Sequence, residues 1–156
     1  MISLRPIDSS NYRVCIELSV APDQQRFVAS NLQSLAEAYV WREAAEPYAV
    51  YSDDEMVGFG LLFPFADDMV DDAAPAPGTE RGYILVRLMI DDRFQGRGYG
   101  RAALDAIVEL VRDRGLPTIR LSVVPDNVQA LDFYRRNGFA ETGEIDGSEI
   151  VMERRI

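Results

Sequence analysis

The chain has 156 residues, of which 47% are hydrophobic, and this predicts a single domain with a buried core over residues 1–156. No apolar run is long enough for a membrane span, and no basic segment precedes an apolar one as in a signal peptide. The net charge of −10 argues against a nucleic-acid partner. It suits a cationic substrate, although solubility alone also explains it. The one cysteine, Cys15, excludes an intrachain disulfide and fits a reducing cytoplasm.

The first predicted elements are a strand and a helix. Residues Ile2 to Arg5 alternate between apolar and polar, which is typical of a strand, and Pro6 ends it. Asp8 or Ser9 can cap a helix that runs to about Val20.

Further helical segments follow. Cys15 lies inside the first helix, where we interpret it as a small buried apolar residue rather than a reactive thiol. Pro22 and Asp23 open a second helical region. The spacing predicts a helix over Asn31 to Trp41, whose apolar residues recur at steps of three and four: Leu32, Leu35, Ala36, Tyr39 and Val40.

A hairpin and a long loop come next. The hairpin pairs Pro47 to Tyr51 with Met56 to Phe65 around the polar turn 52–55, and Gly58 and Gly60 indicate a bulge or a close neighbour. The composition of Ala66 to Glu80 predicts a mobile loop. It either holds the distal ammonium groups of a polyamine or is only solvated, and its carboxylates are Asp67, Asp68, Asp71 and Asp72.

The central stretch runs from a strand through glycines into a helix. The strand is Ile84 to Ile90, and the helix starts near Gly98. Gly115 can take the left-handed position that ends a helix, and Pro117 prevents continuation. The helix is predicted from an apolar stripe formed by Ala103, Leu104, Ile107, Leu110, Val111 and Arg114.

The start of that helix indicates an anion site. No Ser, Thr, Asp or Asn stands immediately before Gly98, while glycine recurs at 96, 98 and 100. Backbone N–H groups at a helix start carry the positive end of the helix dipole, so we infer that a ligand pyrophosphate caps it, with Arg97 and Arg101 adding charge. The spacing matches neither the P-loop nor the dinucleotide fingerprint. An ordinary strand-to-helix turn is the alternative interpretation.

A second βα unit follows downstream. Leu121 to Val124 is predicted as a strand. Asp126, with Gln129 three residues later, predicts a capping box for a helix that stops at Gly138. On that helix Asn127 and Tyr134 share a face and lie roughly 10 Å apart along the axis, which suits two contacts along an extended ligand. The alternative for Tyr134 is a core tyrosine. The last predicted element is a hairpin of Phe139 to Glu144 and Glu149 to Arg155 around Asp146 and Gly147.

Together the two motifs resemble a known family. Gln95-Gly96-Arg97-Gly98-Tyr99-Gly100, followed by Asn127-x-x-Ala130-x-x-Phe133-Tyr134-x-x-x-Gly138-Phe139, resembles the GCN5-related N-acetyltransferases, or GNAT family. The resemblance implies an α/β (α+β) fold with a mixed central sheet of about six or seven strands, about four flanking helices and a splayed strand pair at the coenzyme site. The runs 23–31 and 34–38 resemble the bacterial spermine/spermidine acetyltransferase branch.

The resemblance also implies site residues. Tyr134 takes the position of the tyrosine that protonates the leaving thiolate, and a backbone N–H near Met89 and Ile90 would bind the oxyanion. The chain has no histidine, and Tyr83 to Ile90 contains no glutamate, so the base is Glu37, Glu46, Asp91 or a water chain. No metal is expected. The residues expected to bind acetyl-CoA are Leu88, Met89, Ile90, Gln95, Gly96, Arg97, Gly98, Tyr99, Gly100, Arg101, Asn127 and Tyr134.

The implied function is direct acetyl transfer from acetyl-CoA to a primary amine, with a polyamine such as spermine or spermidine as the favoured small cationic acceptor. Another small amine, an amino acid, an antibiotic or a protein N-terminus is an alternative acceptor. A non-catalytic acyl-CoA-binding regulator is the alternative from a different class. The resemblance further implies a cytoplasmic homodimer that binds no nucleic acid and no membrane.

Overall fold

The computed structural model describes residues 1–66 and 78–156, and a seven-stranded mixed sheet forms its centre. The strand order is β1-β2-β3-β4-β5-β7-β6, and all neighbours are antiparallel except β4 and β5. The strands are β1 Ile2–Pro6, β2 Glu46–Ser52, β3 Glu55–Ala66, β4 Arg81–Ile90, β5 Thr118–Val123, β6 Ala140–Asp146 and β7 Glu149–Arg155. The helices are α1 Tyr12–Glu17, α2 Asn31–Val40, α3 Tyr99–Asp113 and α4 Val128–Arg136, with 3-10 turns at Pro22–Gln24 and Asp92–Phe94.

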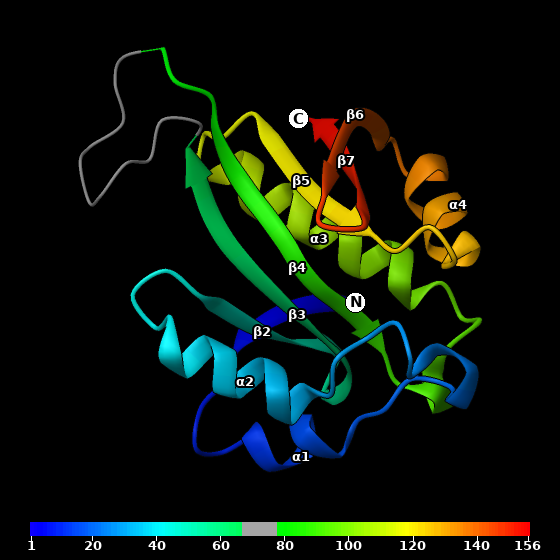
Figure 1. Ribbon diagram of the computed structural model, residues 1–156. Coiled ribbons are helices and arrows are strands. Elements are labelled where there is room, and N and C mark those ends of the chain that lie inside the picture. The colour runs from blue at the N-terminus through cyan, green and yellow to red at the C-terminus, as the bar shows by residue number, and fades with distance from the viewer. Residues whose placement is uncertain (67–77) are drawn as a thin grey trace.

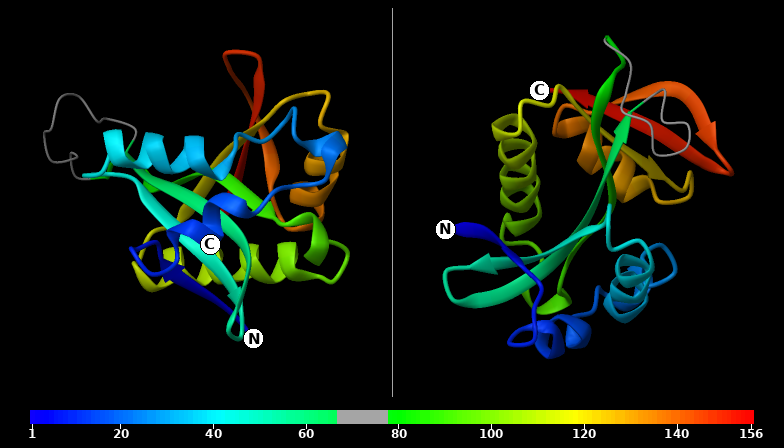
Figure 2. Two further views of the ribbon diagram at one scale, coloured as in Figure 1. Left: turned by 90° about the horizontal axis from the view of Figure 1, so that it is seen from below. Right: turned by 90° about the vertical axis from the view of Figure 1, so that its left-hand side faces the viewer.

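Helices cover the sheet on both faces. Helices α1 and α2 lie on one side, and α3 lies on the other (Figures 1 and 2). The largest apolar cluster joins α3 and α4 to the sheet through residues such as Leu104, Ile107 and Leu131. A second cluster packs α1 and α2 against β3 and β4, with Cys15 and Phe59 fully buried in it. The expected mixed sheet with four helices is therefore confirmed.

The glycines at chain reversals adopt the predicted conformations. Helix α3 ends before Gly115, which has a φ of +68°, and Gly138 follows α4 with a φ of +86°. The predicted hairpins β2–β3 and β6–β7 both form. Gly58 lies against β4, because a Cβ there would stand 2.3 Å from the Met89 carbonyl oxygen, so the close-neighbour interpretation of this glycine is confirmed.

Helix α1 is shorter than predicted. It was expected to run from a cap at Asp8 or Ser9 to about Val20, but it spans Tyr12–Glu17. Its early end has a tertiary cause, because Ser19 pairs with the end of β4. The Ser19 N–H donates to Asp91 Oδ2 at 3.0 Å, and the Ser19 carbonyl accepts from the Asp92 N–H at 2.8 Å. Extended backbone at Leu18, the C-cap, replaces the last predicted turn.

Helix α2 forms where the spacing predicts a helix, and much of its apolar surface is exposed. Its apolar residues Leu32, Tyr39 and Val40 are 63%, 71% and 65% exposed, whereas Asn31 and Ser34 are buried. Asn31 Nδ2 donates to the Cys15 carbonyl at 2.8 Å, and this buried hydrogen bond helps fix how α2 is rotated. The predicted helix is therefore confirmed, and its inward face combines Asn31 and Ser34 with Leu35 and Ala38.

The cap of α4 also differs from the prediction. Asn127, and not Asp126, is the N-cap, and its Oδ1 accepts from the Ala130 N–H at 3.2 Å. The predicted capping box between Asp126 and Gln129 is therefore wrong by one residue.

Two predictions concern the remaining parts of the chain. The acidic residues of the predicted loop at 67, 68, 71 and 72 lie outside the described residues. In the part of the chain that the structure describes, no helix combines the length and the apolar character that a bilayer span requires.

Candidate active site

The pocket lies where β4 and β5 separate. The two parallel strands pair only through Gly82–Ile84 and Thr118–Arg120, and beyond these residues they diverge (Figure 1). Gly82 permits the close approach, because a Cβ there would stand 2.2 Å from the Thr118 carbonyl oxygen. The expected splayed pair is thus present, and a pocket of about 770 Å³ occupies the wedge.

Most of the residues expected to bind the coenzyme share this pocket. Its wall includes Leu88, Met89, Ile90, Gln95, Gly96, Gly98, Tyr99, Gly100, Arg101, Asn127 and Tyr134. Arg97 does not line the wall, and its guanidinium carbon lies 5.8 Å from the centre of the Phe94 ring. One wedge therefore connects the glycine turn at the start of α3 to the tyrosine on α4.

The edge of β4 offers backbone donors to the pocket. The Asp91 N–H donates to the Val57 carbonyl of β3, and hydrogen-bonded and open positions alternate along an antiparallel pair. This alternation directs the N–H of Met89 toward β3 and the N–H groups of Leu88 and Ile90 toward the wedge. The oxyanion donor is expected near Met89 and Ile90. In this region only the backbone N–H groups of Ile90 and Leu88 face the pocket, so they are the candidates for this role. A bulge at Val86, opposite Leu61 and Leu62, changes the pairing just before this edge.

The start of α3 has free backbone N–H groups. Gly98 is the N-cap with a φ of +82° and offers no side-chain hydrogen bond, and Gly96 has a φ of +74°. The Ala102 N–H is the first to bond inside the helix, to the Gly98 carbonyl. The N–H groups of residues 99–101 therefore lack intrahelical partners and stand at the pocket wall. No heavy atom lies within 4 Å of a Cβ built at Gly96 or Gly98, so the space over this turn is open to a ligand.

Gln95 ties the glycine turn to its surroundings. Its Nε2 donates to the Ile90 carbonyl at 2.9 Å and to Gln24 Oε1 at 2.8 Å. The same amide thus holds the end of β4 and the 3-10 turn Pro22–Gln24 against the loop. Gln95 therefore orients the glycine turn, and its Nε2 already donates to two partners within the protein.

Tyr134 reaches the pocket from α4. Its ring makes edge contacts with Phe133 and Phe139, with ring centres 5.2 and 5.4 Å apart. Burial raises the pKa of the Tyr134 phenol to about 12. The raised pKa keeps the phenol neutral at physiological pH. Its hydroxyl has no hydrogen-bond partner among the described residues, so it is available to a ligand. Asn127, on the same wall, uses its Oδ1 for the helix cap, which leaves Nδ2 for a ligand.

Each of the three carboxylates considered as bases has a partner within the protein. None of Glu37, Glu46 and Asp91 lines the pocket. Asp91 Oδ1 accepts from the Arg93 N–H at 3.1 Å and from Arg93 Nε at 2.7 Å. Burial acts to raise the pKa of Asp91, but these hydrogen bonds and the one from Ser19 outweigh it and lower the pKa. Glu37 lies 3.5 Å from the guanidinium of Arg87, which does line the pocket.

Glu46 belongs to a polar cluster outside the pocket. Its carboxylate accepts from Tyr83 at 2.7 Å, Tyr48 at 2.9 Å and Arg114 at 2.6 Å. Burial acts to raise the pKa of Glu46, but the hydrogen bonds from Tyr83, Arg114 and Tyr48 outweigh it and hold the pKa below its ordinary value of 4.5. The cluster joins β2, β4 and the end of α3, so its role is structural.

We expect Glu46→Gln to lower the free energy of unfolding by about 1–3 kcal/mol at pH 7 and to leave kcat/KM unchanged. Because the folded-state pKa is lowered, the stabilisation is present above pH 4.5 and is lost as pH falls through the folded-state pKa. The difference between wild type and variant should therefore shrink in acid. Urea unfolding at pH 7 and below pH 4 measures it, and loss of activity with unchanged stability would restore Glu46 as a base.

Several wall residues were missed from the sequence. They come from the 3-10 turn near α1, from β4 and β5, from α4 and from the β6–β7 hairpin: Gln24, Phe27, Val28, Arg87, Ser122, Gln129, Asp146 and Glu149. Arg87 had a usable signal, because it is the one charged residue between Ile84 and Ile90. The others reach the pocket through the topology, which no local pattern predicts.

A wedge between strands beside an uncapped helix start is the arrangement of an enzyme that binds an extended, phosphate-bearing coenzyme. The model of the acetyltransferase (GNAT) family matches residues 19–139, and the chain belongs to this family. It is an acetyl-CoA-dependent N-acetyltransferase. The chain is 28% identical to the spermine/spermidine N(1)-acetyltransferase of Bacillus subtilis (strain 168), over 99% of each protein. It is 39% identical to the mycothiol acetyltransferase of Rhodococcus erythropolis, over 64% of this chain and 31% of that protein.

Solved structures with the same fold support this assignment. The PaiA N-acetyltransferase of Thermoplasma acidophilum, in complex with coenzyme A, superposes with a TM-score of 0.68 at 18% identity, covering 100% of this chain and 99% of that one. An aminoglycoside acetyltransferase in complex with coenzyme A gives a TM-score of 0.74 at 21% identity, covering 99% and 95%. At these identities the likeness concerns the fold.

Proposed function

We propose that this N-acetyltransferase transfers acetyl from acetyl-CoA to a polyamine. The observation that carries the proposal is the match to the Bacillus spermine/spermidine enzyme over 99% of both chains. The net charge of −10 supports it, because an acidic surface concentrates and steers cations.

The proposed mechanism is direct transfer within the wedge. The pyrophosphate binds the free N–H groups at the start of α3, and the pantetheine arm runs along the open edge of β4. The neutral amine attacks the thioester carbon, and the N–H of Ile90 or Leu88 stabilises the oxyanion. Collapse breaks the carbon–sulfur bond, and the phenol of Tyr134 gives its proton to the leaving thiolate. None of Glu37, Glu46 and Asp91 lies on the wall, so the ammonium loses its first proton through water before the attack. The second proton, which the nitrogen loses on collapse, returns the Tyr134 phenolate to the phenol.

A panel of amines tests the acceptor. Each amine is incubated with enzyme and acetyl-CoA, and the release of free CoA thiol is followed. We expect the highest kcat/KM for spermine or spermidine, ahead of simple monoamines, amino acids, an aminoglycoside and a peptide N-terminus. A non-catalytic regulator would bind acetyl-CoA in calorimetry and release no thiol with any amine.

One observation favours a second acceptor class. Arg87 lines the pocket, and its buried Nε has no hydrogen-bond partner in the described part of the chain. A guanidinium on the pocket wall suits a carboxylate, as in an amino acid or the end of a small peptide. Pairing with Glu37 reduces its repulsion of cations. A preference for carboxylate-bearing amines in the panel would select this candidate.

The remaining properties follow the family and the composition. We propose that residues 1–156 act as a single domain, as a cytoplasmic homodimer, and without nucleic acid as a partner. The charge of −10 supports the last point. Light scattering after size exclusion gives the mass in solution, and a value near 17.5 kDa would exclude the dimer.

A further inference from the structure

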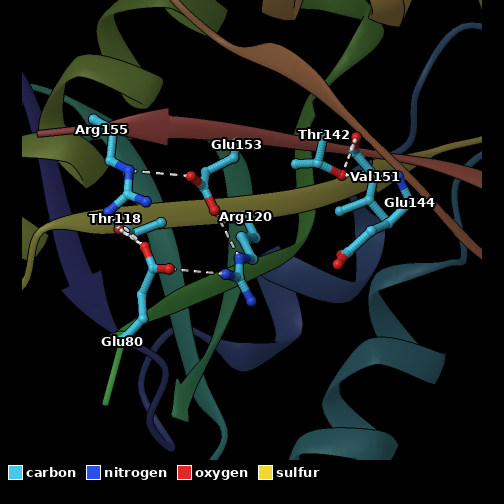
Figure 3. A network of polar contacts seen from close by, with 8 residues as sticks. All are labelled: Glu80, Thr118, Arg120, Thr142, Glu144, Val151, Glu153 and Arg155. Carbon is cyan, nitrogen blue, oxygen red and sulfur yellow. Dashed lines mark hydrogen bonds and ion pairs between the residues drawn. The ribbon is translucent and has the colours of Figure 1, made fainter. Parts of the chain in front are cut away.

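The sheet face next to the pocket has carboxylates on neighbouring strands, and arginines neutralise two of them (Figure 3). Glu153 on β7 accepts from Arg120 Nε at 2.8 Å and lies 3.2 Å from Arg155 Nε. Glu80, just before β4, lies 2.5 Å from Arg155 and 3.4 Å from Arg120. The negative charges in this cluster are therefore matched within the protein.

Glu149 lies on the same face of β7, because residues 149, 151 and 153 alternate with the residues that face the core. Glu149 differs from Glu80 and Glu153 in two respects. Its side chain lines the pocket, and no arginine or N-terminal amine is within ion-pair distance among the described residues. Residues 67–77 supply none either, because that segment contains no lysine or arginine.

The Glu149 carboxylate is also held in place. Its Oε2 accepts from the Ser122 hydroxyl at 2.6 Å, and Ser122 lines the pocket too. Oε1 has no partner in the described part of the chain. A half-buried carboxylate that is oriented by one hydrogen bond and lacks a counter-ion is suited to bind a cation.

We propose that Glu149 is a specificity residue that binds a second ammonium group of the acceptor, while the first amine reacts. The inference rests on the proposed function and narrows it to diamines and longer polyamines. Asp146, on the same wall and also without an ion-pair partner among the described residues, adds to the negative field. A monoamine of equal length leaves this carboxylate without a partner.

The test compares butane-1,4-diamine with butylamine in wild type, Glu149→Gln and Glu144→Gln. Glutamine keeps an oxygen for Ser122, and Glu144 is an exposed residue of the same hairpin that lies off this pocket. We expect Glu149→Gln to lower kcat/KM for the diamine about 10- to 100-fold, the effect of losing one charge-assisted hydrogen bond. The value for butylamine, and both values in Glu144→Gln, should stay within about twofold of wild type. Raising the salt concentration should reduce the diamine preference only where Glu149 is intact.

Three outcomes would overturn the proposal. An equal loss for both amines in Glu149→Gln would mean that the carboxylate acts on the reacting amine. Values for both amines that stay at the wild-type level in Glu149→Gln would mean that Glu149 does not contact the acceptor. If wild type acetylates no amine while it still binds acetyl-CoA, the proposed function itself fails, and the inference fails with it.

Discussion

Tyr134→Phe is expected to lower kcat by about 10²–10⁴-fold, with little change in the KM for acetyl-CoA. The variant removes only the hydroxyl, so the edge contacts with Phe133 and Phe139 remain and the melting temperature should stay the same. The loss falls on kcat because the thiolate needs its proton only when the carbon–sulfur bond breaks. Steady-state kinetics at saturating amine measures it.

The pH profile gives the same prediction a second readout. Because burial raises the pKa of Tyr134 to about 12, the phenol keeps its proton throughout the range in which an aliphatic amine, with a pKa of about 10, becomes neutral. Activity should therefore rise with pH, with no loss of the acid below about pH 11. Tyr39→Phe is the control and should keep its activity, because Tyr39 is 71% exposed and does not line the pocket. Unchanged turnover in Tyr134→Phe at neutral pH would leave Tyr134 as a core tyrosine.

The best predicted elements are those whose signals are local. The spacing of apolar residues in α3, the glycines after α3 and α4, and the turn at Asp146 and Gly147 each depend on a few consecutive residues, and each prediction is confirmed. The glycine turn at residues 95–100 and Tyr134 were predicted in the same way, and the fold brings both to one pocket. Their roles in catalysis and coenzyme binding stay proposals, which the variants Tyr134→Phe and Gly98→Ala test.

What the local patterns missed depends mostly on contacts between distant parts of the chain. Helix α1 stops early because Ser19 bonds to Asp91, 72 residues away. Asn31 of α2 is buried and donates to the Cys15 carbonyl of α1, 16 residues away. Glu149, which no sequence pattern indicated, reaches the pocket from the hairpin because β7 lies beside β5. Strand order cannot be derived from local spacing, so sequence patterns alone could not place residues such as Glu149 at the pocket.

The glycine turn yields the second large effect, because α3 has a glycine with positive φ at each end. Gly98 and Gly115 have φ values of +82° and +68°, and a Cβ at either would meet no atom within 4 Å. An alanine at either position therefore costs about 1–2 kcal/mol of backbone strain and nothing from crowding within the protein. Only Gly98 lies on the pocket wall. The two variants are thus matched in stability and differ in their distance from the coenzyme.

We expect Gly98→Ala to raise the KM for acetyl-CoA about 10- to 100-fold, while Gly115→Ala leaves it unchanged. The methyl group and the shifted backbone would weaken the charged hydrogen bonds from the start of α3 to the pyrophosphate. S-Acetylpantetheine, which lacks the diphosphate, separates this effect from a general disturbance of the pocket, because its kcat/KM should be the same in wild type and Gly98→Ala. Equal losses with both acetyl donors, or an equal loss in Gly115→Ala, would mean that the turn supports the fold and does not bind the diphosphate.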